Sequence, residues 1–173
     1  MNDNTPTAPP DESQGFFHGI RPVAVALGAL IDQISTMVLN VLLLGLIASD
    51  YESAPGVIDE DALKALAQDP NMLAAWLGIG TFCTGLGGFM GARMAGHHHA
   101  RHGAFVGLAG VAMGLMAYAA RQTPYPPALW YDLLSFGLLV PAGAIGGLLC
   151  ASLGSRADPG AEAEPTETEP DDR

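Results

Sequence analysis

Four long runs of almost uncharged residues constrain this chain more than any other feature. They cover residues 23–48, 72–95, 104–120 and 128–153. A helix needs about 20 apolar residues to cross the roughly 30 Å hydrocarbon core of a bilayer. The runs lack the polar outer face, repeating every 3.6 residues, that a soluble bundle would show. The sequence therefore predicts an all-α integral membrane protein, a four-transmembrane-helix bundle with helices at about 22–48, 72–96, 103–121 and 128–154.

The charged residues lie mostly outside these runs. Only 14% of residues are charged, yet 18 acidic against 7 basic residues give a net charge of −11. Six acidic residues against Lys64 fall in segment 49–71, and seven against two arginines fall in 154–173. We expect a membrane domain at 21–154 between disordered tails at 1–20 and 155–173, because the tails are rich in Pro, Glu, Thr and Asp. So few basic residues exclude a nucleic-acid partner.

The distribution of basic residues predicts the orientation in the membrane. With four spans, both tails and loop 96–103 share one side, and arginine and lysine concentrate on the cytoplasmic side. That side would hold Arg21, Arg93, Arg101 and Arg156. The other side would hold Lys64 and Arg121 in two loops, the first with a short helix at 59–67. We expect both termini to be cytoplasmic, in the inner membrane of a prokaryote. The aromatic residues expected at the opposite membrane surface are Trp76, Tyr118, Trp130 and Tyr131.

Small residues spaced four apart let helix backbones approach each other, since lipid gives no hydrophobic drive for association. Such stripes are Gly80, Thr84 and Gly88; Gly87 and Gly91; Gly103 and Gly107; and Gly143 and Gly147. We interpret them as helix-packing surfaces, with a ligand-lining role as the alternative. The motifs GGFMGARMAG (87–96) and GGLLCASLGS (146–155) are alike. They indicate either two parallel-repeat hairpins or a chance similarity in a chain rich in glycine.

Asp32 is the charged residue best placed to matter for a mechanism, because it lies well inside the first run. Intramembrane carboxylates are costly and usually face the bundle interior or a cavity. Ser35, Thr36 and Asn40 extend this candidate polar site along one side of the helix. Three interpretations stay open: a structural hydrogen bond between helices, a proton- or cation-binding position, and a contact with another subunit. Arg93 lies close to the end of its run, so no basic residue at the depth of Asp32 is available to pair with it.

Four histidines crowd the short loop between the second and third runs. They are His97, His98, His99 and His102. Clustered imidazoles can bind Zn, Cu or Ni, although the loop holds no cysteine or carboxylate. The alternative is an interfacial turn. The two cysteines would differ in depth by roughly 13 Å at 1.5 Å per residue, so we expect two free thiols. We expect no cofactor and, because no catalytic motif occurs, no enzymatic activity.

The segment GGFMGARMAGHHHARHGAFVGL, residues 87–108, resembles the middle of small uncharacterised prokaryotic membrane proteins with four spans. The resemblance implies the four-span layout and carries no activity. The residues themselves favour a non-enzymatic integral membrane protein that acts through helix packing, as a homo-oligomer or as an accessory subunit of a membrane protein partner in the lipid bilayer. The alternative is a small ion- or proton-coupled transporter or channel that uses Asp32.

Overall fold

A computed structural model describes residues 19–50, 60–120 and 126–156, and this part of the chain is almost entirely helical. The helices are α1 (Pro22–Asp50), α2 (Glu60–Gln68), α3 (Pro70–Ala95), α4 (His99–Ala119) and α5 (Leu129–Arg156). All but α2 are long and apolar enough to cross a membrane. The predicted all-α bundle of four membrane-spanning helices is therefore confirmed. The predicted tails, 1–20 and 155–173, lie almost wholly outside the described residues.

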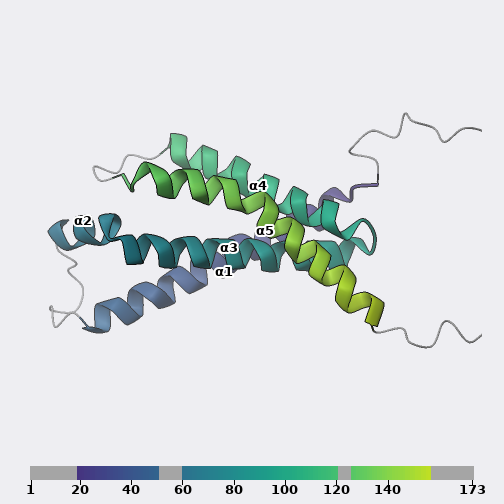
Figure 1. The fold of residues 1–173 in the computed structure, drawn as a ribbon, viewed down its shortest axis with the longest axis horizontal. Helices are drawn as coiled ribbons and strands as arrows, with labels where there is room; N and C mark the ends of the chain where they lie inside the picture. The colour runs from purple at the N-terminus through teal and green to yellow at the C-terminus, as the bar shows by residue number, and fades with distance from the viewer. Residues whose placement is uncertain (1–18, 51–59, 121–125, 157–173) are drawn as a thin grey trace, which may run out of the picture.

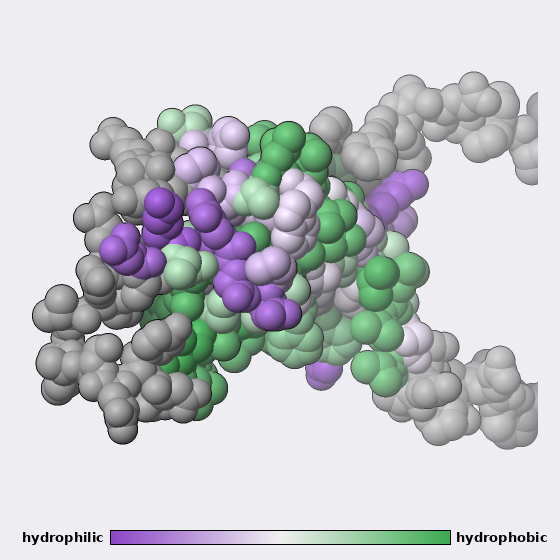
Figure 2. Space-filling view, turned by 60° about the vertical axis from the view of Figure 1, so that its left-hand side comes forward, coloured by the Kyte–Doolittle hydropathy of each residue, from purple (hydrophilic) through white to green (hydrophobic). Residues whose placement is uncertain are grey.

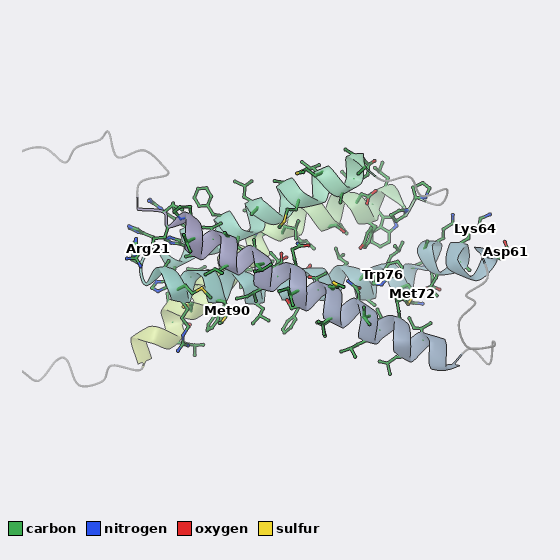
Figure 3. The ribbon with its side chains drawn as sticks, turned by 180° about the vertical axis from the view of Figure 1, so that it is seen from behind. Arg21, Asp61, Lys64, Met72, Trp76 and Met90 are labelled. Atoms are coloured by element: carbon green, nitrogen blue, oxygen red, sulfur yellow. The ribbon has the colours of Figure 1, made fainter. Side chains whose placement is uncertain are left out.

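The helix α3 lies at the centre of the bundle and contacts α1, α4 and α5 (Figure 1). The helix α5 packs on α3 and α4, and α1 packs on the same two helices. Within the described residues, α1 and α5 do not contact each other. At one end, which we call the histidine end, α1 and α4 begin and α3 and α5 finish (Figure 1). At the opposite or open end, α1 diverges from α4 and α5 (Figures 1 and 3).

The short helix α2 leads into α3 at the open end. Asp69 caps α3, because its Oδ1 accepts hydrogen bonds from the Asn71 N–H at 2.7 Å and the Met72 N–H at 3.0 Å. Pro70 occupies the first turn, where a missing N–H costs nothing. Figure 3 labels Asp61 and Lys64 on α2 at this end. Figure 2, which turns the open end forward, shows hydrophilic side chains gathered there and apolar ones along the flanks.

Glycines bring the helix backbones together in the half of the bundle nearer the histidine end. A Cβ on Gly87 of α3 would meet the Gly28 carbonyl of α1 at 2.6 Å. A Cβ on Gly88, one residue later, would meet the backbone of Gly143 on α5. Gly143 also meets Gly103 of α4. Three helices therefore touch backbone to backbone at Gly143, which only residues without a side chain allow.

The remaining predicted packing glycines divide into two groups. Gly91 faces Ala24 of α1, Gly107 faces Leu139 of α5, and Gly147 faces the backbone of His99 on α4. Gly80, in contrast, has no atom within 4 Å of a Cβ position. The packing prediction is wrong for Gly80, because the helices have separated at its level and it lines a cavity instead.

The two similar glycine motifs do not make equivalent contacts. Gly87 of α3 faces α1, its hairpin partner, whereas the matching Gly146 of α5 faces Gly85 of α3. Gly88 faces α5, whereas the matching Gly147 faces α4. The similarity between residues 87–96 and 146–155 is therefore not reflected in the way the two helices pack.

The helix α5 bends near its middle, where Pro141 interrupts the ladder of backbone hydrogen bonds (Figure 1). Its first half runs beside α4, and its second half crosses α3 (Figure 1). Gly143, two residues after Pro141, meets both Gly103 of α4 and Gly88 of α3.

A matched pair of glycines on α3 tests the packing. Gly88→Ala should destabilise the protein by about 1–3 kcal/mol, since the added methyl collides with the α5 backbone. Gly78→Ala should leave stability unchanged or raise it, because nothing lies within 4 Å of that position and alanine favours the helix. Thermal unfolding in detergent measures both variants. Equal melting temperatures for the two would contradict the assigned contact.

Candidate functional site

A cavity of about 580 Å³ separates α1 from α3, α4 and α5 in the half of the bundle toward the open end. It begins at the level of Asp32 and reaches the helix ends at Trp76 and Asp132. Its polar lining residues are Asp32, Gln33, Thr36, Asn40, Thr81, Thr84, Tyr118, Tyr131, Asp132 and Ser135. Its other lining residues are Leu44, Trp76, Leu77, Gly80, Gly110, Met113, Gly114, Ala117, Phe136 and Leu139. From Trp76 to Thr84 the wall of α3 rises about 12 Å at 1.5 Å per residue.

Asp32 lies at the inner end of this cavity and is only 2% exposed. Its Oδ1 accepts a hydrogen bond from the Thr84 hydroxyl of α3 at 3.2 Å and one from the Thr36 hydroxyl at 3.4 Å. Its Oδ2 lies toward Gly110 of α4, 3.6 Å from where a Cβ would stand. Among the described residues, Oδ2 has no hydrogen-bond partner, and both hydrogen bonds from side chains reach Oδ1.

The position of Asp32 follows from the glycine packing beside it. A Cβ on Gly87 would lie 2.9 Å from the Asp32 Cβ, so the close approach of α3 requires glycine there. Asp32 is ten residues from the start of α1, or about 15 Å along the helix axis. That distance is half of the roughly 30 Å hydrocarbon thickness, so the carboxyl group sits near mid-membrane.

The other members of the predicted polar site divide between the cavity and the helix backbone. Thr36 and Asn40 line the cavity with Asp32. Ser35 does not line it, and its hydroxyl donates to the Ile31 carbonyl of the preceding turn at 2.6 Å. The Ser35 hydroxyl is therefore hydrogen-bonded within α1, and Ser35 is not part of the cavity wall.

Sequence reasoning missed the wall that α5 contributes. Asp132, Ser135, Phe136 and Leu139 all line the cavity. The Ser135 Oγ is buried and has no hydrogen-bond partner among the described residues. These four residues follow the i, i+3, i+4, i+7 spacing of one helix face, a signal that could have identified this wall from the sequence.

The charge of the lining is acidic. Asp32 at the inner end and Asp132 near the open end are both carboxyl groups, and the described lining residues include no Lys, Arg or His. Four aromatic side chains also line the cavity: Trp76, Tyr118, Tyr131 and Phe136. The Tyr118 and Phe136 rings meet edge to face, with centroids 6.3 Å apart. The described lining therefore offers carboxyl groups that a cation could pair with and no basic group that an anion could pair with.

The histidine turn between α3 and α4 closes the opposite end of the bundle. His102 is completely buried, and its Nε2 accepts a hydrogen bond from the Arg21 N–H at 3.0 Å. Because Nε2 is the acceptor, Nδ1 carries the proton and donates to the His98 carbonyl at 3.2 Å. His102 therefore joins the turn to the start of α1.

His97 makes a second link between the turn and the segment before α1. Its Nε2 lies 2.8 Å from the Gly19 carbonyl and its Nδ1 lies 2.9 Å from the Ala95 carbonyl. His98 adopts a left-handed conformation, with φ 46°, that reverses the chain into α4. With both ring nitrogens of His97 and His102 engaged by backbone atoms, these two residues are not free to bind metal. No group of three His, Cys, Asp or Glu side chains in the described residues could hold a metal ion.

The two cysteines lie on different helices. Cys83 of α3 and Cys150 of α5 are both buried, free thiols. Neither lines the cavity.

Comparison with known proteins finds no matching family model, no matching curated protein and no matching solved structure. The resemblance of residues 87–108 to small four-span proteins therefore carries no family assignment, and function must be argued from the cavity itself.

The histidine turn yields a prediction. His102→Phe keeps a ring of similar size but leaves the Arg21 N–H without its acceptor. The His98 carbonyl loses the ring N–H and keeps the backbone N–H of residue 102. The unpaired Arg21 N–H should cost about 1–3 kcal/mol. Hydrogen exchange should quicken at the first turn of α1, as measured by mass spectrometry of the detergent-solubilised protein. His99→Phe is the control, because the His99 side chain makes no hydrogen bond with the described residues. The assigned role is wrong if the two variants exchange alike.

Proposed function

We propose that this integral membrane protein is a small cation-coupled transporter, in which Asp32 binds a proton or another small cation delivered through the cavity. The observation that carries the proposal is the Asp32 carboxyl group, buried near mid-membrane at the inner end of an acidic cavity, with Oδ2 unpartnered among the described residues. Ionisable groups at such depth mark ion pathways and proton relays. The proposal includes no catalytic step.

The hydrogen bonds of Asp32 favour binding over a purely structural role. A structural carboxyl group would be expected to engage both oxygens with partner helices, because unsatisfied polar atoms in a membrane are costly. Here a single hydrogen bond, from Thr84, crosses to another helix. The hydroxyls of Thr36 and Thr84 could also turn their oxygens toward a bound cation, since a hydroxyl both donates and accepts.

The shape of the bundle supports a transport cycle. The cavity reaches the open end, while backbone contacts at Gly28, Gly87 and Gly143 close the bundle between Asp32 and the histidine end. A site reached from one side only is one of the two states that alternating access requires. The helix α1 is the element best suited to move, because it is the least buried span and does not touch α5.

A second candidate function is that of an oligomer or accessory subunit. The observation that favours it is the exposure of large apolar side chains along α1, including Met37, Val41 and Leu46. Lipid can cover this surface, and so can a second copy or a membrane protein partner. Under this hypothesis Asp32 only joins α1 to α3, and the purified protein carries no ion flux.

We further propose that the histidine end faces the cytoplasm of a prokaryotic cell. Arg21, Arg93 and Arg101 all lie at that end, whereas Lys64 lies at the open end (Figure 3 labels Arg21 and Lys64). This asymmetry follows the positive-inside rule. The cavity would then take up its cation from outside the cell.

The orientation can be tested by labelling cysteines introduced at exposed positions. In intact cells, a membrane-impermeant maleimide should label Lys64→Cys and should not label Arg101→Cys. The native Cys83 and Cys150 are buried, so the wild-type protein gives the background. After the cells are opened, both variants should react. Labelling of Arg101→Cys alone in intact cells would reverse the proposed orientation.

Transport is tested by ion flux in proteoliposomes. Under an imposed membrane potential, the wild-type protein should move protons or Na⁺, as reported by an internal pH dye or by ²²Na⁺ uptake. Asp32→Asn should abolish this flux, because the amide cannot lose a proton or pair with a cation. Asp132→Asn, which removes the outer carboxyl group, should reduce the flux but not abolish it.

The two candidate functions separate on these outcomes. A wild-type protein without flux, purified as a stable oligomer, would favour the subunit role and overturn transport. Flux that survives Asp32→Asn would show that another pathway carries the ion. Thermal unfolding of both variants in detergent must match the wild type, so that a loss of flux reports on the site and not on folding.

A further inference from the structure

We infer that the transported or bound substrate of this cavity is an organic cation, a monovalent ammonium or similar group carrying apolar substituents. The inference rests on the proposed function, because it assigns Asp32 as the anionic partner. It goes further by naming the chemical class that fills the space between Asp32 and the open end.

The size of the cavity argues against an inorganic ion as its sole occupant. About 580 Å³ lies within the 300–1,000 Å³ that small-molecule sites occupy. A proton or a metal ion at Asp32 would use only the inner end. The remaining space extends about 12 Å along α3, past Gly80, where the absence of a side chain widens it.

The lining supplies apolar and aromatic contacts from three helices. Trp76 comes from α3, Tyr118 from α4, and Tyr131 and Phe136 from α5. Aromatic rings attract cations through the negative potential of their faces, and they also cover apolar substituents. Sequence reasoning expected Trp76, Tyr118 and Tyr131 to be membrane-surface anchors, but all three line the cavity.

The charges fix the sign of the substrate. The carboxyl groups of Asp32 and Asp132 face the cavity from α1 and α5, and the other titratable groups that line it are the phenols of Tyr118 and Tyr131. With no basic residue in the described lining, no positively charged group there would pair with an anion. A single carboxyl group at the inner end matches a single positive charge, for which a proton would compete.

A neutral occupant, such as a lipid chain, would fit the apolar part of the lining but not the inner end. It would leave the Asp32 Oδ2 and the buried Ser135 Oγ without partners. Unpaired polar groups in a dry site cost about 1–3 kcal/mol each. A cation that reaches Asp32 removes the cost at Oδ2.

The test uses tetraphenylphosphonium, an apolar monovalent cation whose charge does not change with pH. Isothermal titration with the purified full-length protein in detergent, at pH 8, should show saturable binding. Asp32→Asn should weaken it at least about tenfold, equivalent to 1.4 kcal/mol. Trp76→Ala should weaken it by about three- to thirtyfold, the range of a desolvated cation–aromatic contact. Tetraphenylborate, an anion of similar shape, should not bind.

Matched variants separate specific binding from folding defects and from partition into apolar surface. Trp76→Phe keeps an aromatic ring and should retain most of the affinity. Phe82→Ala removes an aromatic ring from the same helix at a position 64% exposed and outside the cavity, so its affinity should stay within about twofold of the wild type, as expected for a site that makes no contact.

Three alternative outcomes would each overturn the organic-cation inference, the proposed function, or both. Equal binding of tetraphenylborate and tetraphenylphosphonium, or binding unaffected by Asp32→Asn, would overturn the organic-cation assignment and indicate adventitious partition. Asp32-dependent proton or Na⁺ flux without tetraphenylphosphonium binding would overturn this inference and leave the proposed function standing. Absence of both flux and binding would overturn both.

Discussion

Close contact between glycine-bearing helix backbones is the interaction on which the rest of this structure depends. Lipid offers no hydrophobic drive for helix association, so the spans must associate through packing and hydrogen bonds. Gly87 allows α1 to reach α3, and Gly88 and Gly103 both meet Gly143 of α5. These contacts all lie between Asp32 and the histidine end, and there they bring four helices into one closed unit.

The cavity lies in the other half of the bundle, where the helices are further apart. Toward the open end, larger side chains such as Leu44, Trp76 and Phe136 line the space between the helices, and α1 diverges from α4 and α5 (Figure 1). The transition occurs within about two turns of α3, between Gly87, which touches α1, and Gly80, which touches nothing. Asp32 lies at this boundary. Asp32 is both buried and in contact with the cavity because the distance between α1 and α3 increases at its level.

The fold could be predicted from the sequence because hydrophobicity and length alone decide how many helices span a bilayer. Which face of each helix meets which neighbour could not be predicted to the same degree. Gly80, Thr84 and Gly88 share one stripe, yet Gly88 packs on α5, Thr84 bonds to α1, and Gly80 faces the cavity. Helical spacing places these three residues on one face of α3. The divergence of α1 then determines where along α3 that face loses contact with another helix.

The candidate site, like the fold, could be predicted only in part. Asp32, Thr36 and Asn40 could be predicted because polar residues on an apolar span avoid lipid. The opposing wall, with Ser135 and Asp132 on α5, depends on a contact between segments about 100 residues apart in sequence, for which local spacing gives no partner. The histidines were ambiguous for another reason. Imidazole serves equally as metal ligand and hydrogen-bond partner, and the roles of His97 and His102 depend on the backbone atoms of Gly19 and Arg21.

Under the proposed function, the position of Asp32 would couple ligand binding to helix packing. Its Oδ1 accepts the Thr84 hydrogen bond that joins α1 to α3, and its Oδ2 faces the cavity. A proton or cation that neutralises the carboxyl group weakens its pull on the Thr84 hydroxyl, because charge-assisted hydrogen bonds are roughly twice as strong as neutral ones. Under the proposed function, occupation of the cavity would therefore weaken one of the contacts between α1 and α3, next to the backbone contact of Gly28 with Gly87. The helix α1 contacts α3 and α4 but not α5, so under the proposed function a weaker hydrogen bond at Thr84 would favour the movement of α1 that changes the side from which Asp32 is reached.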